Sequence, residues 1–104
     1  MALRIRVCQA GEVAPGHHRG FAVPGVTWPI LVANVDGEII ATAGVCPHED
    51  VSLIDGHIEH GEIVCPGHGY HFDLASGRCV HAPRLVLRRY AITIIGDDVW
   101  VDLL

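Results

Sequence analysis

Two cysteine–histidine pairs have the residue types and the spacing of a metal site. One residue separates Cys46 from His48, two separate Cys65 from His68, and sixteen residues lie between the pairs. Cysteine thiolates and neutral imidazoles both bind iron, and a two-iron, two-sulfur cluster takes four protein ligands, two on each iron. The four residues together can therefore hold one [2Fe-2S] cluster.

Zinc is the alternative metal, because thiolate and imidazole also suit zinc. Structural zinc sites usually combine a Cys-x2–4-Cys pair with a His-x3–5-His pair. Here each pair mixes one cysteine with one histidine. The spacing fits zinc poorly, and a zinc or iron–sulfur regulatory module stays as the less favoured hypothesis.

The chain has the length and composition of one domain, which we expect to span residues 1–104. Half of its residues are apolar, enough for a modest core. No segment approaches the roughly 18 apolar residues of a membrane span, and the first fifteen residues lack a run of signal-peptide length. We expect a cytoplasmic protein with no membrane contact, in which four cysteines serve as metal ligands or buried thiols rather than disulfides.

The charges argue against nucleic acid as a partner, because the formal net charge is -5 and nucleic-acid binding depends on many cationic contacts. All seven basic residues are arginines, and none lies between Phe21 and Gly77, a stretch rich in Asp and Glu. We expect a negative face on the middle of the molecule. It either steers basic partners or only keeps the protein soluble.

The apolar residues follow the period of strands rather than helices. Leu3, Ile5 and Val7 alternate with arginines, as in a half-buried strand. Asp36-Gly37 separates two apolar segments, 29–35 and 38–43, and is a strong hairpin signal. A second hairpin is expected from segments 89–95 and 99–103 around residues 96–98. We predict an all-β fold, an antiparallel sandwich or small barrel, into which residues 44–83 are inserted with short strands near Ile58 and Ile63.

With these features the sequence resembles the Rieske ferredoxins over nearly its whole length. The motifs that carry the resemblance are Cys46-Pro47-His48, Cys65-Pro66-Gly67-His68-Gly69, His71-Phe72-Asp73, Ser76-Gly77 and Ala82-Pro83. The resemblance implies a Rieske-type β fold with a small cluster-binding subdomain at about 44–83. It also implies one [2Fe-2S] cluster, with one iron on Cys46 and Cys65 and the other on His48 and His68.

The resemblance further implies a function without substrate turnover by the chain itself. Rieske ferredoxins carry single electrons from an FAD-containing NAD(P)H reductase to a terminal oxygenase, either an aromatic-ring dioxygenase or a di-iron monooxygenase, as in aromatic hydrocarbon catabolism. We expect a monomer with these two partners. The competing hypothesis is a Rieske subunit bound permanently within a larger oxidoreductase.

Two departures from the high-potential branch of that family bear on the reduction potential. The disulfide cysteines of that branch would fall at Val51 and Gly67, and its hydroxyl donors at Tyr70 and Phe72, where Phe72 has no hydroxyl. We therefore expect a potential near the low end of the Rieske range, about -150 mV.

We expect the remaining candidate residues to have structural rather than chemical roles. Cys8 and Cys79 are expected to be small buried hydrophobes, and Trp28 and Trp100 to belong to the core. Six further histidines lack ligand spacing and are expected on the surface: His17, His18, His57, His60, His71 and His81. Four arginines of the last third form a solvated face or contact a partner: Arg78, Arg84, Arg88 and Arg89.

Overall fold

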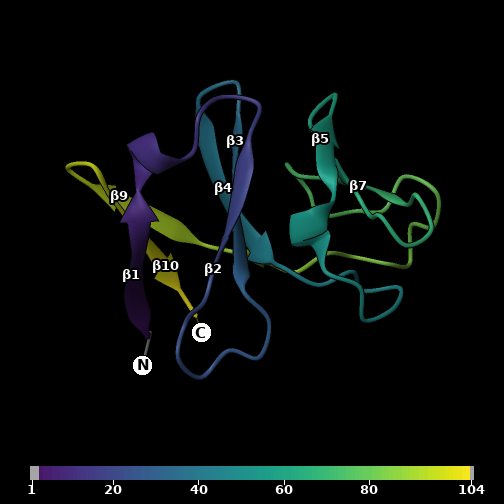
Figure 1. The fold of residues 1–104 in the computed structure, drawn as a ribbon, viewed down its shortest axis with the longest axis horizontal. Coiled ribbons are helices and arrows are strands. Elements are labelled where there is room, and N and C mark those ends of the chain that lie inside the picture. Colours follow the sequence, from purple (N-terminus) through teal and green to yellow (C-terminus); the bar gives the residue numbers. More distant parts are fainter. Residues whose placement is uncertain (1–2, 104) are drawn as a thin grey trace.

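A computed structural model describes residues 3–103 as ten short antiparallel strands in three sheets, with two 3-10 turns (Figure 1). The all-β expectation is confirmed. The strands are β1 (Arg4–Gln9), β2 (His18–Phe21), β3 (Ile30–Val35), β4 (Glu38–Ala43), β5 (His57–Glu59), β6 (Glu62–Val64), β7 (His71–Asp73), β8 (Arg89–Tyr90), β9 (Ile92–Ile95) and β10 (Asp98–Asp102). The turns are η1 (Ala10–Glu12) and η2 (Leu53–Asp55).

The central sheet has the order β2-β3-β4-β8 and contains the predicted hairpin. β3 and β4 pair along their whole length, and Asp36 and Gly37 form the turn with φ values of 52° and 93°. A two-residue turn with positive φ at both positions matches the twist of the strands that it joins. The Asp-Gly signal thus predicted this hairpin correctly.

Both faces of the central sheet are buried, because its strands alternate apolar residues toward two separate cores. Ile30 and Val32 of β3 pack with Val99 and Val101 of β10 on one face. On the other face, Leu31 and Ala33 join a second core, whose remaining buried members are Ile40, Cys46, Leu53, Ile63, Cys65, Phe72, Leu74, Cys79 and Leu87. The second core ties residues 44–83 to the central sheet.

A three-stranded sheet of order β1-β10-β9 covers the first face, at the left of Figure 1. The sequence predicted one strand over 89–95, but the chain changes sheets there: β8 pairs with β4, and β9 pairs with β10. The turn between β9 and β10 is also shorter than expected, because Asp98 already pairs with Ile95. Only Gly96 and Asp97 remain in it.

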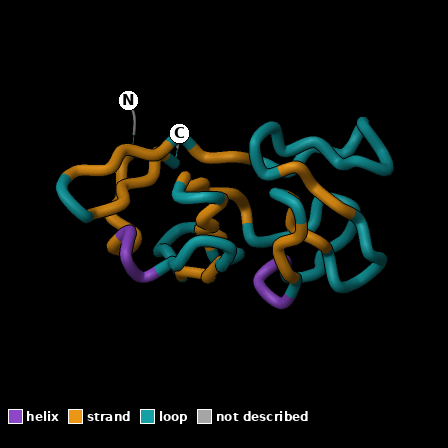
Figure 2. Tube along the Cα trace, turned by 90° about the horizontal axis from the view of Figure 1, so that it is seen from above, coloured by secondary structure: helices purple, strands orange, loops and turns teal. Residues whose placement is uncertain are grey.

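Residues 44–83 contain the third sheet, of order β5-β6-β7, at the right of Figure 1. Strands at Ile58 and Ile63 are present as predicted, and they face each other across the β5–β6 hairpin. Figure 2 shows that much of this end of the molecule is loop. Buried residues of this half, among them Phe72 and Leu74, pack in the core and fix the short strands that carry these loops.

Phe72 is the largest fully buried side chain of this half and should dominate its stability. We predict that Phe72→Ala lowers the free energy of unfolding by about 3–5 kcal/mol, the usual cost of removing a buried aromatic ring. Chemical denaturation followed by circular dichroism measures the change. Ile94→Ala, at an exposed position of β9, is the control and should change it by less than about 1 kcal/mol.

Two predictions about individual side chains need correction. Trp28 and Trp100 are only half-buried, and neither belongs to the two core clusters found within residues 3–103. Phe72 is the largest fully buried side chain instead. Cys8 and Cys79, in contrast, are buried free thiols as predicted, in different cores on opposite sides of the central sheet.

In the part of the chain that the structure describes, no helix is long and apolar enough to cross a membrane.

Candidate metal centre

The first Cys/His pair lies in a six-residue loop, 46–51, that closes on itself. The backbone N–H of Cys46 donates to the carbonyl of Val51 at 2.9 Å, and an isolated bridge joins Val45 to Ser52 below the loop. Ser52 also begins η2, since its hydroxyl accepts from the N–H of Ile54. The loop is therefore fixed at both of its ends.

The second pair lies in a loop of the same construction, 65–70, which connects β6 to β7. The N–H of Cys65 donates to the carbonyl of Tyr70 at 2.8 Å, and Val64 pairs with His71 below the loop. Gly69 has a φ of 71°, a conformation that glycine adopts without strain. In both loops, then, the cysteine comes first and bonds to the residue five positions later.

The two cysteines lie side by side at the bottom of the site. Cys46 and Cys65 are 2% and 1% exposed, and their thiols are within hydrogen-bonding range of each other. Burial raises the pKa of the Cys46 thiol, although the backbone N–H groups of His48 and Glu49 also point at its sulfur and oppose the rise. Such N–H groups stabilise a thiolate once a metal binds, and metal binding then displaces the thiol proton.

The two histidines lie together at the exposed surface. The rings of His48 and His68 are 5.0 Å apart between centroids and nearly perpendicular. Tyr70 packs edge-on against His48, with 4.5 Å between the ring centroids. The site thus presents two sulfur donors in its interior and two nitrogen donors at its rim.

This arrangement fits two metal ions better than one. A single tetrahedral zinc would require all four donor atoms to lie close to one another, at 2.0–2.3 Å from a common centre. Among residues 3–103, the one group of three or more donors within 4.8 Å of one another is His48, Glu49 and His68, which excludes both cysteines. A thiol pair separated from an imidazole pair matches a [2Fe-2S] cluster with mixed ligands, so the residues present fit that group.

Glu49 is a neighbour of the site that the sequence analysis missed. Its carboxylate contacts Nδ1 of His68 at 2.6 Å, and both side chains are about half exposed. The only sequence signal was that Glu49 directly follows the first Cys-x-His motif. Its contact with the second loop depends on the folded arrangement of both loops.

The two positions at which the resemblance placed a disulfide in the high-potential branch are neighbours here. A Cβ added at Gly67 would lie 3.1 Å from Cγ2 of Val51. The side chain of Val51 in the first loop therefore lies directly beside Gly67 in the second. Phe72, which has no hydroxyl, is fully buried beneath the second loop.

Two of the six other histidines are not simple surface residues. His71 is half-buried, and its Nδ1 lies 2.9 Å from the carboxylate of Glu62. His18 is also half-buried, with Nε2 2.9 Å from the carbonyl oxygen of Ile54, so it joins β2 to η2. His17, His57, His60 and His81 are exposed, as predicted.

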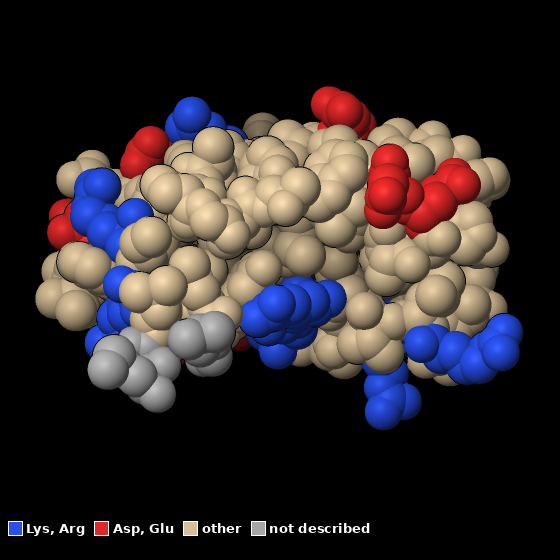
Figure 3. Space-filling model, turned by 90° about the horizontal axis from the view of Figure 1, so that it is seen from below, with Lys and Arg blue, Asp and Glu red and all other residues tan. Residues whose placement is uncertain are grey.

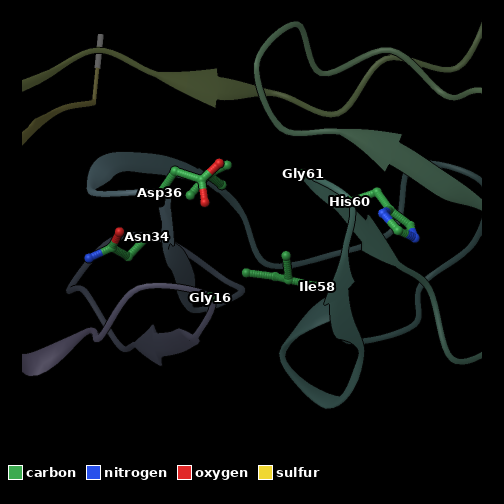
Figure 4. A pocket seen from close by; sticks show the side chains of 7 residues that line it. Gly16, Asn34, Asp36, Ile58, His60 and Gly61 are labelled. Carbon is green, nitrogen blue, oxygen red and sulfur yellow. The ribbon is translucent and has the colours of Figure 1, made fainter.

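A cleft of about 350 Å³ lies elsewhere, between the β3–β4 hairpin and the β5–β6 hairpin (Figure 4). Asn34 lines it, but both ends of that amide are already bonded, to the carbonyl of Val13 and the N–H of Gly37. In Figure 4, Ile58 points across the cleft, whereas His60 points away from Asp36. No set of reactive side chains converges on this cleft in the described chain.

The charges around the metal centre are divided between two edges. Figure 3 shows acidic side chains along one edge of the half that carries β5–β7 and basic side chains along the other. Glu49 and Asp50 of the first loop are exposed, and so are Arg78 and Arg84. The negative face expected for the middle of the molecule is therefore limited to one edge of this half, because basic side chains occupy the other edge.

The fold and this centre define a class: a small β protein that carries an iron–sulfur cluster at the tip of two loops. Comparison with known proteins makes the class specific. The Rieske [2Fe-2S] domain model matches residues 4–91, and the chain belongs to this family. It carries a Rieske-type [2Fe-2S] cluster and acts as an electron carrier, not as an enzyme by itself.

The relatives are ferredoxins of oxygenase systems. The ferredoxin component of biphenyl 2,3-dioxygenase from Rhodococcus jostii (strain RHA1) is 37% identical over 99 residues, which cover 94% of this chain and 91% of the relative. The solved Sphingomonas yanoikuyae B1 ferredoxin is 31% identical with a TM-score of 0.88, covering 98% and 100% of the two chains. The ferredoxin in a complex with the oxygenase of carbazole 1,9a-dioxygenase is 29% identical with a TM-score of 0.85, covering 95% and 92%.

Proposed function

We propose that this chain is the soluble, cytoplasmic ferredoxin of an aromatic-ring dioxygenase system. It takes single electrons from an FAD-containing NAD(P)H reductase, delivers them to a terminal oxygenase and works as a monomer. The observation that carries the proposal is the meeting of two equivalent loops, with a buried thiol pair below an exposed imidazole pair. When bound, the cluster supplies a site for one reversible electron.

In this proposal residues 44–83 form the cluster-binding subdomain and supply all four ligands. Cys46 and Cys65 would hold one iron, and the N–H groups of His48 and Glu49 that point at the Cys46 sulfur would help to stabilise the thiolate. His48 and His68 would hold the other iron. Because the His68 side chain is about half exposed, a docked protein could exchange electrons with the cluster at the edge formed by the two histidines.

Two neutral imidazoles in place of two thiolates remove two negative charges from the ligand set. The potential rises above that of an all-cysteine cluster, which lies near -400 mV in plant-type ferredoxins. Phe72 supplies no hydroxyl hydrogen bond to a sulfur, so the rise stays small and the potential should be about -150 mV. Such a value suits electron flow from a flavin reductase to an oxygenase.

The similar ferredoxin of carbazole 1,9a-dioxygenase is in a solved complex with its oxygenase. This complex supports a terminal oxygenase as the electron acceptor for this chain as well. The experiment is reconstitution: the anaerobically reduced protein is mixed with the oxygenase components of the biphenyl and carbazole dioxygenase systems. We expect single-turnover product formation that requires this protein. No electron transfer to either oxygenase, with a reducible cluster present, would contradict the proposal.

The same preparation distinguishes a shuttle from a fixed subunit. A shuttle should elute as a monomer and support many oxygenase turnovers at substoichiometric amounts. Elution only as part of a larger complex of fixed stoichiometry would favour a permanently bound subunit.

A further inference from the structure

Residues 77–87 form a short two-stranded ribbon beside the metal centre, and the proposed function gives this ribbon no role. An isolated antiparallel β-bridge pairs Arg78 with Val86, and the N–H of Cys79 donates to the carbonyl of Leu85 at 3.0 Å. The N–H of Leu87 donates in the same register to the carbonyl of Gly77. A further bridge joins Cys79 to Phe72, so the ribbon extends the β5-β6-β7 sheet.

The inward face of the ribbon is apolar and buried. Cys79 and Leu87 belong to the core beside the central sheet, and Leu85 packs against that core. Because side chains alternate across a strand, the strand residues next to them must point outward. The register places Arg78, Val80 and Val86 on the outward face, and Arg84 is exposed in the 82–85 turn that closes the ribbon.

This outward face combines exposed apolar groups with free positive charge. Val80 and Val86 are 55% and 53% exposed, two of the five large hydrophobic residues exposed within residues 3–103. Arg78 and Arg84 form no salt bridge with any residue that the structure describes, whereas Arg4, Arg6 and Arg19 each have an acidic partner. Exposed apolar surface next to unpaired charge is typical of an interaction site.

The ribbon lies close to the exposed edge of the metal centre. His81, which follows Val80, has its ring centroid 6.1 Å from that of Tyr70. Tyr70 in turn packs against His48 at 4.5 Å. A protein seated on the ribbon would therefore lie two aromatic contacts from a proposed iron ligand.

We infer that the outward face of the ribbon and its turn, formed by Arg78, Val80, Arg84 and Val86, docks a redox partner whose own surface is acidic around an apolar centre. The inference rests on the proposed function, since it names the surface through which a partner engages. A short ribbon can supply such a docking face, because transient redox interfaces fall at the low end of interface areas. The acidic edge with Glu49 and Asp50 lies outside this docking face.

The test compares charge reversal on the ribbon with the same reversal elsewhere. Arg78→Glu/Arg84→Glu is compared with Arg4→Glu/Arg6→Glu, which changes the net charge equally on β1 at the far side of the molecule (Figure 1). Stopped-flow absorption measures the second-order rate constants with the reductase and with an oxygenase that accepts electrons in the reconstitution above. Oxidation by uncharged 1,4-benzoquinone checks that each variant still has a working cluster.

We expect the ribbon variant to react at least tenfold more slowly than wild type with one of the two partners at low salt, and the difference to shrink as salt rises. Val80→Ser/Val86→Ser should slow the same partner with an unchanged salt dependence. Equal rates for the ribbon variant and the β1 control, with both partners, would overturn the inference. That result would leave the proposed function intact, because the wild type would still transfer electrons.

Discussion

Replacement of Cys46 with alanine is expected to abolish cluster binding and to leave a colourless protein. The Cys46 thiol is buried against that of Cys65, and both lie where two closed loops meet. Without one of the two thiolates, the iron that Cys46 and Cys65 would share lacks its second protein ligand, and water cannot easily replace it in a buried site. Iron and acid-labile sulfide per protein should fall at least tenfold, as measured by chemical analysis and visible absorption.

Cys79→Ala is the matched control for this loss. Cys79 is as buried as Cys46 and belongs to the same core, so its truncation imposes a similar packing cost. It lies outside both loops and should leave the cluster content at the wild-type level. If both alanine variants lost iron to the same extent, the loss would reflect destabilisation of the core, and the role of Cys46 as a ligand would be contradicted.

The second large effect concerns the histidines. The double variant His48→Cys/His68→Cys converts the ligand set to four thiolates and adds two negative charges next to the site of reduction. The potential should fall from about -150 mV toward about -400 mV, the difference between Rieske and plant-type clusters. Spectroelectrochemical titration measures it.

His60→Cys is the control for the added thiols, because His60 is also exposed but lies in the turn of the β5–β6 hairpin. It should leave the potential unchanged. A double variant that keeps its cluster and its wild-type potential would show that His48 and His68 are not ligands.

Much of the centre could be predicted from the sequence because the relevant signals are local. The spacing of Cys46 with His48 and of Cys65 with His68 is a property of two short loops, and each loop closes through its own backbone bond. The Asp36-Gly37 turn is equally local, since both residues tolerate positive φ. Such features require no knowledge of distant parts of the chain.

The errors concern features that tertiary packing decides. The apolar pattern around Ala91 predicts one strand. In the structure this segment is divided between two sheets, because β8 pairs with β4 and β9 pairs with β10. Arg78 and Arg84 are late in the sequence, but the ribbon carries them back to the metal centre. Glu49 meets His68 only after both loops have folded. None of these contacts leaves a periodic or spacing signal.

The measurement that tests the central claim most directly is electron paramagnetic resonance of anaerobically purified protein, before and after dithionite. We expect a red-brown, silent oxidised state and a paramagnetic reduced state whose average g value is lower than that of an all-cysteine [2Fe-2S] cluster. A colourless protein that contains zinc, or a reduced spectrum typical of four thiolate ligands, would contradict it.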